Sequence, residues 1–297
     1  MRFLNKFIQG VWNVGIIEKP INELMENPKD FKIRWVKHKY KDRFFADPFL
    51  HKVDEKFYYI LVEEFLYYTN VGHISMLMVD KKSMKLISKK RVIKENWHLS
   101  YPFVVGDLII PEAHRSGCST GYLFNGKEVE SKQRHFGKGL IDPTIVQYQQ
   151  YTYMFTANSN MPLASLSIYC KKNGEKDWFE HSLNPVKEDI KTARPGGKFF
   201  YYNGNLFRPV QDSEERYGRR IRILQIEELS PNNFKEREVA SFSSDNNYPY
   251  NLGLHTFNVE DGFVVVDGYK EYKSFFVRPM CLKFPKIMKY FGEKNED

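Results

Sequence analysis

A two-residue signature, in which a polar residue precedes proline, recurs along the chain and constrains its fold more than any other feature. The polar residues of the five copies are Asp47, Tyr101, Asp142, Arg194 and His255, and the last copy has Thr256 in place of proline. The copies stand 41 to 61 residues apart, which is close to the length of one blade of a β-propeller. The spacing therefore predicts five repeated units, none of which can bury both of its faces without a neighbour.

An apolar strand follows each signature after a turn and ends in polar residues. These strands cover residues 57–62, 108–111, 151–157, 205–210 and 263–266. A third strand with alternating apolar residues is visible in most units, at residues 73–79, 165–169 and 220–226. The pattern predicts an all-β chain: a five-bladed β-propeller with four-stranded antiparallel blades around a central funnel.

We expect a single propeller domain over residues 1–297. Residues 1–40 form an N-terminal extension, in which a strand at 11–17 closes the ring against the last blade and residues 20–25 form a short helix. Residues 285–297 form a C-terminal tail with a helix at 285–291. We expect the tail to pack on the body, with attachment to a membrane surface as the alternative.

Composition and charge narrow the classes of protein. A hydrophobic fraction of 42% and an aromatic fraction of 16% are typical of a globular chain. The three cysteines, Cys118, Cys170 and Cys281, fit no metal-binding spacing. Together with the absence of a signal peptide and of a spanning segment, they predict a cytoplasmic protein, with attachment to the inner membrane face as a variant.

The net charge of +8 is spread along the chain, and its densest basic run covers residues 34–43. One interpretation is a solvated edge strand protected by lysines. The alternative is a patch for an anionic ligand or an anionic membrane surface. No nucleic-acid-binding motif is present, so we expect no nucleic-acid partner.

Two of the signature residues are aspartates on inner strands, where a charge costs free energy unless it is hydrated, paired or used. Asp47 and Asp142 stand at matched places, so the ring should bring them to one axis. Acid–base chemistry at a glycosidic bond requires two carboxyl groups that face one cavity. The sequence thus predicts Asp47 and Asp142 as catalytic, although each could instead cap a turn.

Further polar residues cluster near the strand ends. Glu112 is the third candidate for catalysis. Only one of the adjacent Glu63 and Glu64 can face the axis, because neighbouring strand residues point to opposite faces. Arginines suit phosphate or carboxylate groups, although an Arg–Asp pair within a blade is the alternative for the fourth unit. The predicted substrate-binding residues are Glu63, Glu64, Tyr101, His114, Arg115, Asn158, Arg194, Arg208, Gln211, Asp212, His255 and Asp267.

No cofactor is expected and no residue is assigned to a metal. A metal ion on the axis near His255 stays open, because a histidine in a channel can bind a sugar hydroxyl, ligate a metal or sit satisfied in the core.

Several of these segments occur together, in the same order, in a known family. Residues 45–49, 62–64, 98–103, 110–112, 141–144, 206–212 with 217–218, and 254–257 with 265–268 carry the likeness. With them the chain resembles the N-terminal propeller domain of the plant glucosamine inositolphosphorylceramide transferases and its bacterial polysaccharide-locus relatives. The resemblance covers roughly residues 11–270.

More remotely the chain is similar to the five-bladed glycoside hydrolases of the arabinanase and invertase type. That resemblance implies a base or nucleophile at Asp47 and an acid-tuning or sugar-holding role at Asp142. The glutamate that serves as general acid in those enzymes is replaced here by Arg194. An acid must then come from Glu112, Glu63, Glu64 or Asp212, and an arginine suits a phosphorylated or nucleotide-linked sugar.

From the motifs and the resemblance we expect the protein to act on a glycosidic or sugar-phosphate bond, by glycosyl transfer or hydrolysis. The reaction would belong to the synthesis of a surface polysaccharide or glycolipid. Its substrate would be a carbohydrate or an activated sugar. The alternative is a non-catalytic glycan-binding module that partners a glycosyltransferase. A scaffold for proteins is disfavoured, because a scaffold needs no polar residues on its inner strands.

Overall fold

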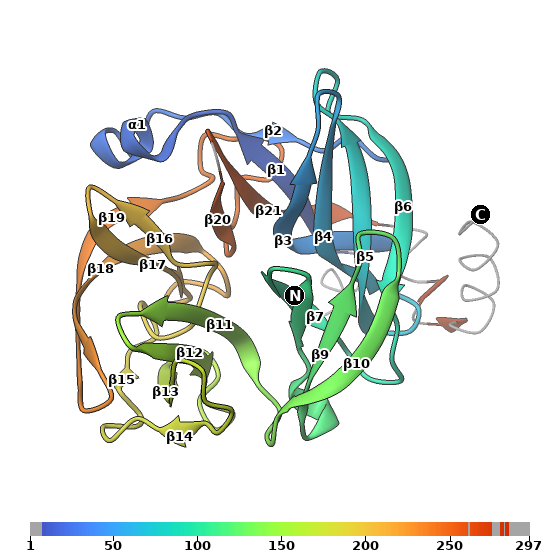
Figure 1. Cartoon of the computed structure of the whole chain (residues 1–297). Coiled ribbons are helices and arrows are strands. Elements are labelled where there is room, and N and C mark those ends of the chain that lie inside the picture. The colour runs from blue at the N-terminus through green and yellow to red at the C-terminus, as the bar shows by residue number, and fades with distance from the viewer. Residues whose placement is uncertain (1–7, 261, 275–279, 282, 285–297) are drawn as a thin grey trace.

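Five antiparallel sheets surround a central axis in the computed structural model of the chain (Figure 1). The structure describes residues 8–260, 262–274, 280–281 and 283–284. The predicted five-bladed all-β propeller is thus confirmed. The predicted tail at residues 285–297 lies outside the described residues. Within them, no helix has the length and apolar character needed to cross a membrane.

Each blade runs outwards from the axis in chain order, except the last. Blade 1 comprises β3 (Arg43–Val53), β4 (Phe57–Leu66), β5 (Val71–Asp80) and β6 (Leu86–Ile93). Blade 2 comprises β7 (Ser100–Val105), β8 (Leu108–Glu112), β9 (Ser119–Phe124) and β10 (Val129–Phe136). Blade 3 comprises β11 (Ile141–Tyr148), β12 (Tyr151–Ala157), β13 (Ser165–Lys172), β14 (Phe179–Glu180) and β15 (Lys187–Glu188). Blade 4 comprises β16 (Phe200–Tyr202), β17 (Asn205–Asp212), β18 (Arg220–Ser230) and β19 (Asn233–Phe242).

Blade 5 joins the two ends of the chain. Its inner strands are β20 (Phe257–Glu260) and β21 (Phe263–Lys273), and its outer strands are β1 (Ile8–Ile17) and β2 (Arg34–Trp35). β1 pairs with β21 along its whole length, from Ile8 opposite Lys273 to Ile17 opposite Val264. The predicted ring-closing strand is therefore confirmed, as is the short helix, observed as α1 (Ile21–Glu26).

The core lies between neighbouring blades. Val14, Ile16 and Val265 of blade 5 pack against Phe45 and Val62 of blade 1, and none of the five is exposed. A similar apolar layer joins blade 3 to blade 4. Burial of this kind is worth about 25 cal/mol per Å2 of apolar surface. The alternating strand pattern places these side chains on the faces between blades, which leaves the inner strand ends to polar residues.

Three of the signature residues share the same unusual backbone conformation. The φ value is 50° at Asp47, 42° at Tyr101 and 46° at Asp142. This is a left-handed conformation that residues other than glycine seldom adopt. At each of them the pairing between the first and second strand of the blade slips by a bulge. Bulges redirect side chains and cluster at functional sites. The repeated signature thus encodes a kink that turns one residue per blade toward the axis.

Two details differ from the sequence prediction. Arg194 and His255 do not lie in inner strands: the Arg194 segment has only an isolated bridge, from Pro195 to Val210, and His255 precedes β20. Gly197 explains the break in blade 4, since its φ of 148° and the carbonyl of Phe257 leave no room for a side chain. In blade 3 the outer place is split between β14 and β15.

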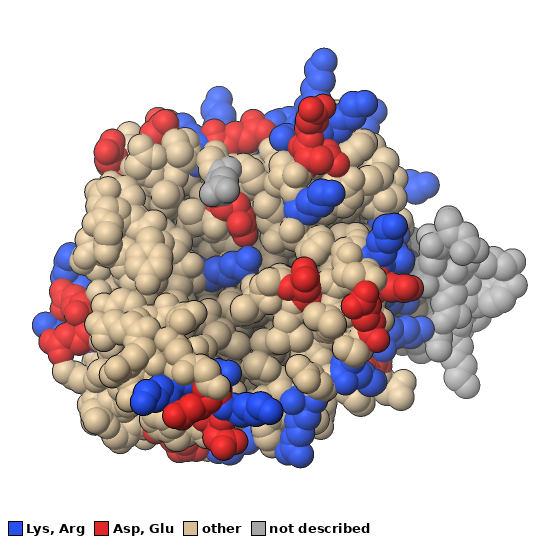
Figure 2. All heavy atoms as spheres, viewed as in Figure 1, with Lys and Arg blue, Asp and Glu red and all other residues tan. Residues whose placement is uncertain are grey.

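The face in Figure 2 is hollowed near its middle, where the blades meet. Acidic and basic side chains are scattered around its rim and do not form one patch. The high net charge is therefore not gathered around the opening on this side.

Candidate functional site

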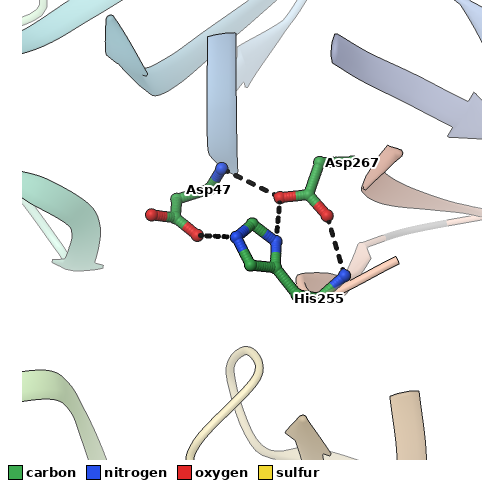
Figure 3. Close-up of side chains that lie close together, drawn as sticks. All are labelled: Asp47, His255 and Asp267. Carbon is green, nitrogen blue, oxygen red and sulfur yellow. Dashed lines mark hydrogen bonds and ion pairs between the residues drawn. The ribbon is translucent and has the colours of Figure 1, made fainter. Parts of the chain in front are cut away.

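Asp267 is the hub of a polar cluster at the axis (Figure 3). Its Oδ1 accepts the backbone N–H groups of His255 and Thr256, both at 3.0 Å, and its Oδ2 accepts the backbone N–H of Asp47 at 3.1 Å. This carboxylate is completely buried. Three amide donors hold an anion here, and they tie blade 5 to the kink of blade 1.

His255 lies between the two aspartates. Its Nδ1 is 2.6 Å from Asp267 Oδ2, and its Nε2 is 3.7 Å from Asp47 Oδ1 (Figure 3). Burial acts to lower the pKa of His255, but the adjacent Asp267 and Asp47 carboxylates outweigh it, so its pKa is raised. The imidazole therefore favours its protonated form, which pairs with both carboxylates.

Asp47 is held by two donors of its own. Its Oδ1 accepts the hydroxyl of Thr256 at 2.9 Å, and its Oδ2 accepts the backbone N–H of Tyr101 at 3.1 Å. Burial raises the pKa of Asp47 to about 6, against the opposing effect of His255. A carboxyl group with a pKa near neutrality is suited to accept a proton during a reaction.

Asp47, His255 and Asp267 each offer one ligand atom within 4.8 Å of the others, which is a geometry that a metal ion can use. The ligand types agree with a divalent ion. However, both oxygens of Asp267 already accept backbone N–H groups, and both oxygens of Asp47 accept donors as well. A metal would have to share or displace these donors, so the donor set fits a protonated histidine better than a cation.

A second polar group surrounds Asp142 in blade 3. Its Oδ2 accepts Nε of Arg194 at 2.6 Å and Nε2 of Gln211 at 2.8 Å. Its backbone N–H donates to Oε2 of Glu112 at 3.3 Å, and Glu112 is 3.8 Å from Nη2 of Arg194. Blades 2, 3 and 4 thus meet at one carboxylate.

The clusters around Asp267 and Asp142 share one hydrogen-bonding pattern. The backbone N–H of each kinked residue donates to a carboxylate of the preceding blade: Asp47 to Asp267, Tyr101 to Asp47, and Asp142 to Glu112. Each left-handed kink exposes its amide to the axis, and a carboxylate satisfies it. Buried amides need such partners, so part of the acidity at the axis is structural.

The pKa values of Glu63 and Glu112 are also strongly raised. Burial, together with the neighbouring Asp47 or Asp142 carboxylate, raises the pKa of each well above its usual range. Arg194 opposes the effect at Glu112 without cancelling it. Both side chains therefore favour the neutral acid form, which can donate a proton.

The raised pKa values of the axial groups predict a contribution to stability that falls as the pH rises. Burial lowers the pKa of His38, His73, His98 and His135 to about 4, so these histidines contribute in the opposite direction. The native state of Asp47, Glu63 and Glu112 holds protons that the unfolded chain releases near pH 4, and the raised pKa of His255 acts in the same direction. We expect the free energy of unfolding of the wild type, measured relative to that of the double variant Glu63→Gln/Glu112→Gln, to fall by about 2 kcal/mol or more from pH 5 to pH 8. Chemical denaturation at both pH values measures it.

The double variant Glu63→Gln/Glu112→Gln removes two of the titrating groups, so the comparison with the wild type isolates their contribution to the pH dependence from that of the histidines. An exposed Glu128→Gln variant should keep the wild-type dependence. A difference in stability between the wild type and the double variant that does not fall from pH 5 to pH 8 would contradict the raised pKa values of Glu63 and Glu112.

An aromatic wall borders His255. Trp12 stacks on the imidazole at 3.9 Å between ring centroids, and Tyr217 contacts both rings edge-on. Gly218 makes this contact possible: its φ is 61°, and a Cβ there would lie 2.7 Å from that of His255. The residue Tyr217 is 43% exposed, and the centroid of its ring lies 5.3 Å from the Arg194 guanidinium carbon. Tyr217 thus offers an accessible aromatic surface beside the charged groups.

The structure brings together Asp47, Glu63, Glu112, Asp142, Arg194, Gln211, His255 and Asp267 among the predicted residues. Tyr101 contributes its backbone N–H, while its buried ring packs on Phe49.

Other predicted residues have different partners. Glu64 binds Arg43 and Ser75 within blade 1. Asp212 binds Arg222, which fits the predicted alternative of an Arg–Asp pair within the blade, whereas Arg208 binds Glu236 of the same blade. Asn158 accepts the N–H of Asn160 in a turn, and His114 and Arg115 are exposed on a short 3-10 helix.

Sequence reasoning assigned no role to Trp12, Thr256 and Tyr217. Thr256 follows His255 in the fifth signature, at the place where the other copies have proline, so its position was a usable signal. Trp12 lies on the closing strand, and only its pairing with β21 brings it to the axis.

Comparisons with known proteins agree with this fold. The family model described as glucosamine inositolphosphorylceramide transferase 1, N-terminal, matches residues 30–252. The chain is 31% identical over 211 residues to glucosamine inositolphosphorylceramide transferase 1 of Arabidopsis thaliana, covering 66% of this chain and 27% of that protein. It is 29% identical over 227 residues to the protein of the same name from Oryza sativa subsp. japonica, covering 72% and 29%. The chain thus spans less than a third of the length of these relatives.

Solved structures are similar at lower levels. A GH43_1 enzyme from Xanthomonas citri is 11% identical with a TM-score of 0.48, covering 79% of this chain and 88% of that one. Zg3597, a family 117 glycoside hydrolase from Zobellia galactanivorans, is 9% identical with a TM-score of 0.45, covering 81% and 89%. Both values are too low to bear on chemistry. Because the family model matches most of the sequence, the chain belongs to the glucosamine inositolphosphorylceramide transferase 1 N-terminal family.

Proposed function

We propose that the axial cluster binds a sugar that carries a phosphoryl or other anionic group and acts at its glycosidic or sugar-phosphate bond. The observation that carries this proposal is the pairing of unlike carboxyl groups on one axis. Asp47, with a pKa of about 6, can accept a proton, and Glu112, with its raised pKa, can donate one. Reactions at an acetal carbon use such a base or nucleophile together with an acid.

Arg194 supports the anionic part of the substrate. It uses Nε for Asp142, and Nη2 is 3.8 Å from Glu112. A guanidinium of this kind can bind a phosphoryl oxygen beside the reacting bond. The exposed ring of Tyr217, close to Arg194, can stack on the sugar ring. Relatives named as transferases of a glycolipid agree with a role in glycolipid or surface-polysaccharide synthesis.

The proposal keeps the cytoplasmic location expected from the cysteine pattern. The supporting observation is that Cys118, Cys170 and Cys281 are all free thiols.

Arg194→Lys tests the anionic substrate. Lysine keeps the charge but loses the fork that reaches Asp142 and a phosphoryl group at once. We expect affinity for hexose 1-phosphates, measured by calorimetry, to fall about 10-fold, which corresponds to about 1.4 kcal/mol. Affinity for the free hexoses should stay unchanged. The matched control, Arg222→Lys, alters the ion pair with Asp212 away from the axis and should change neither. An equal loss for phosphorylated and free sugars would contradict the proposed role.

A second candidate is a non-catalytic glycan-binding module that guides a transferase. The observation that favours it is the length of the relatives, more than two thirds of which lies outside the matched region. This candidate predicts sugar affinity without turnover of any nucleotide sugar or aryl glycoside. The proposed reaction predicts measurable release of the nucleotide or of the aryl alcohol.

A further inference from the structure

The basic run at residues 34–43 is not part of the axial cluster, and it forms a groove. Two hollows of about 580 and 490 Å3 share His38, Lys39 and Tyr40 as their common wall. The first also contains Lys37, Lys85 and Lys89, and the second Lys41, Arg43 and Lys270. Among the described residues, no aspartate or glutamate lines either hollow. We call these two hollows the seam groove.

Most of the basic side chains in the seam groove form no ion pair within the described part of the chain. Arg43 and Lys89 pair with the buried Glu64, and Arg43 also pairs with Asp42. Lys37, Lys39, Lys41 and Lys85 are exposed and form no ion pair with the described residues. Neighbouring like charges repel one another, so this arrangement favours an anion from outside.

The strand directions place the seam groove relative to the axis. It follows the segment that leads from β2 in blade 5 to β3 in blade 1. Arg43 is four residues before Asp47 on β3, and Lys270 is three residues beyond Asp267 on β21. The strand β21 is antiparallel to the inner strand β20. Positions after Asp267 on β21 and positions before Asp47 on the inner strand β3 therefore lie toward the same end of the propeller. Arg43 and Lys270 both lie at this end, about 10 Å from the axial cluster along the strands. The groove therefore ends on the side where the axial residues lie.

The shape of the seam groove favours a linear polyanion over an anionic membrane surface. A membrane surface is broad and meets a protruding face, whereas two hollows in series receive a chain. Lys37, Lys39 and Lys41 alternate with His38 and Tyr40, which gives a charge at every second residue, and Tyr250 and Tyr272 add aromatic rings to the second hollow. Lysines bind anionic groups, and tyrosines offer flat surfaces to sugar rings. We propose that the seam groove binds an acidic polysaccharide, a linear glycan with carboxylate or phosphate groups along it.

This inference goes beyond the axial reaction, because the hydrogen bonds and ion pairs described above for Asp47, Glu112 and Arg194 involve other residues than those of the groove. The probe is polygalacturonate of defined length, with neutral dextran as its uncharged counterpart, and binding is measured by calorimetry at several salt concentrations. We expect polygalacturonate to bind at least 10-fold more tightly than dextran, with affinity that falls as salt rises.

The triple variant Lys37→Gln/Lys39→Gln/Lys41→Gln should lose at least 10-fold in affinity and show a weaker dependence on salt. The matched control, Lys29→Gln/Lys127→Gln/Lys172→Gln, removes the same charge from exposed positions elsewhere and should bind like the wild type. Both variants should retain affinity for hexose 1-phosphates, which separates this site from the axial one.

Equal binding by the two triple variants would overturn the inference, since net charge alone would then explain the affinity. So would wild-type binding to vesicles containing phosphatidylserine, or to a single-stranded oligonucleotide, that is as tight as binding to polygalacturonate. If hexose 1-phosphate binding failed while the groove variants behaved as expected, the axial proposal would fall and this one would stand.

Discussion

Asp47→Asn is expected to abolish turnover, by at least about 10^3-fold, while the protein stays folded. An amide cannot accept the proton that Asp47 would take at its raised pKa, nor can it act as a nucleophile. Its oxygen can still accept the N–H of Tyr101, and its NH2 group can donate to the hydroxyl of Thr256, so both hydrogen bonds of the native residue have replacements. The unfolding temperature should therefore stay within about 3 °C of the wild type.

The measurement is release of nucleotide or aryl alcohol from a panel of nucleotide sugars and aryl furanosides, alongside thermal unfolding. Asp177→Asn, at an exposed position, is the matched control and should change neither quantity. Retained turnover in the Asp47 variant would remove this residue from the reaction. A variant that binds sugar less tightly, in a protein that never turns over, would instead support the glycan-binding module.

Asp267→Ala is expected to have the largest effect on stability. It leaves the backbone N–H groups of Asp47, His255 and Thr256 without an acceptor in a buried place and removes the partner of His255. Unsatisfied buried donors and a broken buried ion pair predict a loss of about 4 kcal/mol. For a chain of this size that corresponds to a fall of about 6 °C in unfolding temperature.

Asp267→Asn provides a graded comparison. Its amide oxygen can still accept from His255 and Thr256, whereas its NH2 group would face the N–H of Asp47, so about half of the loss should remain. Calorimetric unfolding of both variants, with Asp177→Ala as an exposed control, measures the series. An alanine variant as stable as the wild type would mean that Asp267 does not hold the two blades together.

The repeated signature predicted the blades because it marks a backbone requirement that is local. A polar residue before proline, followed by a turn and an apolar strand, defines each inner hairpin, and it correctly placed Asp47 and Asp142 at the axis. It did not reveal that blade 4 breaks at Gly197 or that His255 precedes its strand. Those depend on close approaches between segments far apart in the chain, such as Gly197 to Phe257.

The partners of single residues were less predictable. Glu63 and Glu64 are neighbours in the sequence, yet one lies with the axial carboxylates and the other pairs with Arg43 inside blade 1. The alternation of a strand predicted that they diverge, but not which of them faces the axis. Trp12 was missed for a related reason: its neighbours on the wall, Tyr217 and His255, are more than 200 residues away, and only ring closure brings the three rings together.

The polar cluster at the axis is complete only when β1 has paired with β21. Trp12 lies on the first strand of the propeller and Asp267 on the last, with Val14 opposite Asp267 in the register. A nascent or truncated chain with four finished blades would lack the hub of the cluster and the stacking partner of its histidine. The proposed binding of a sugar therefore requires that the first and last strands of the propeller have paired.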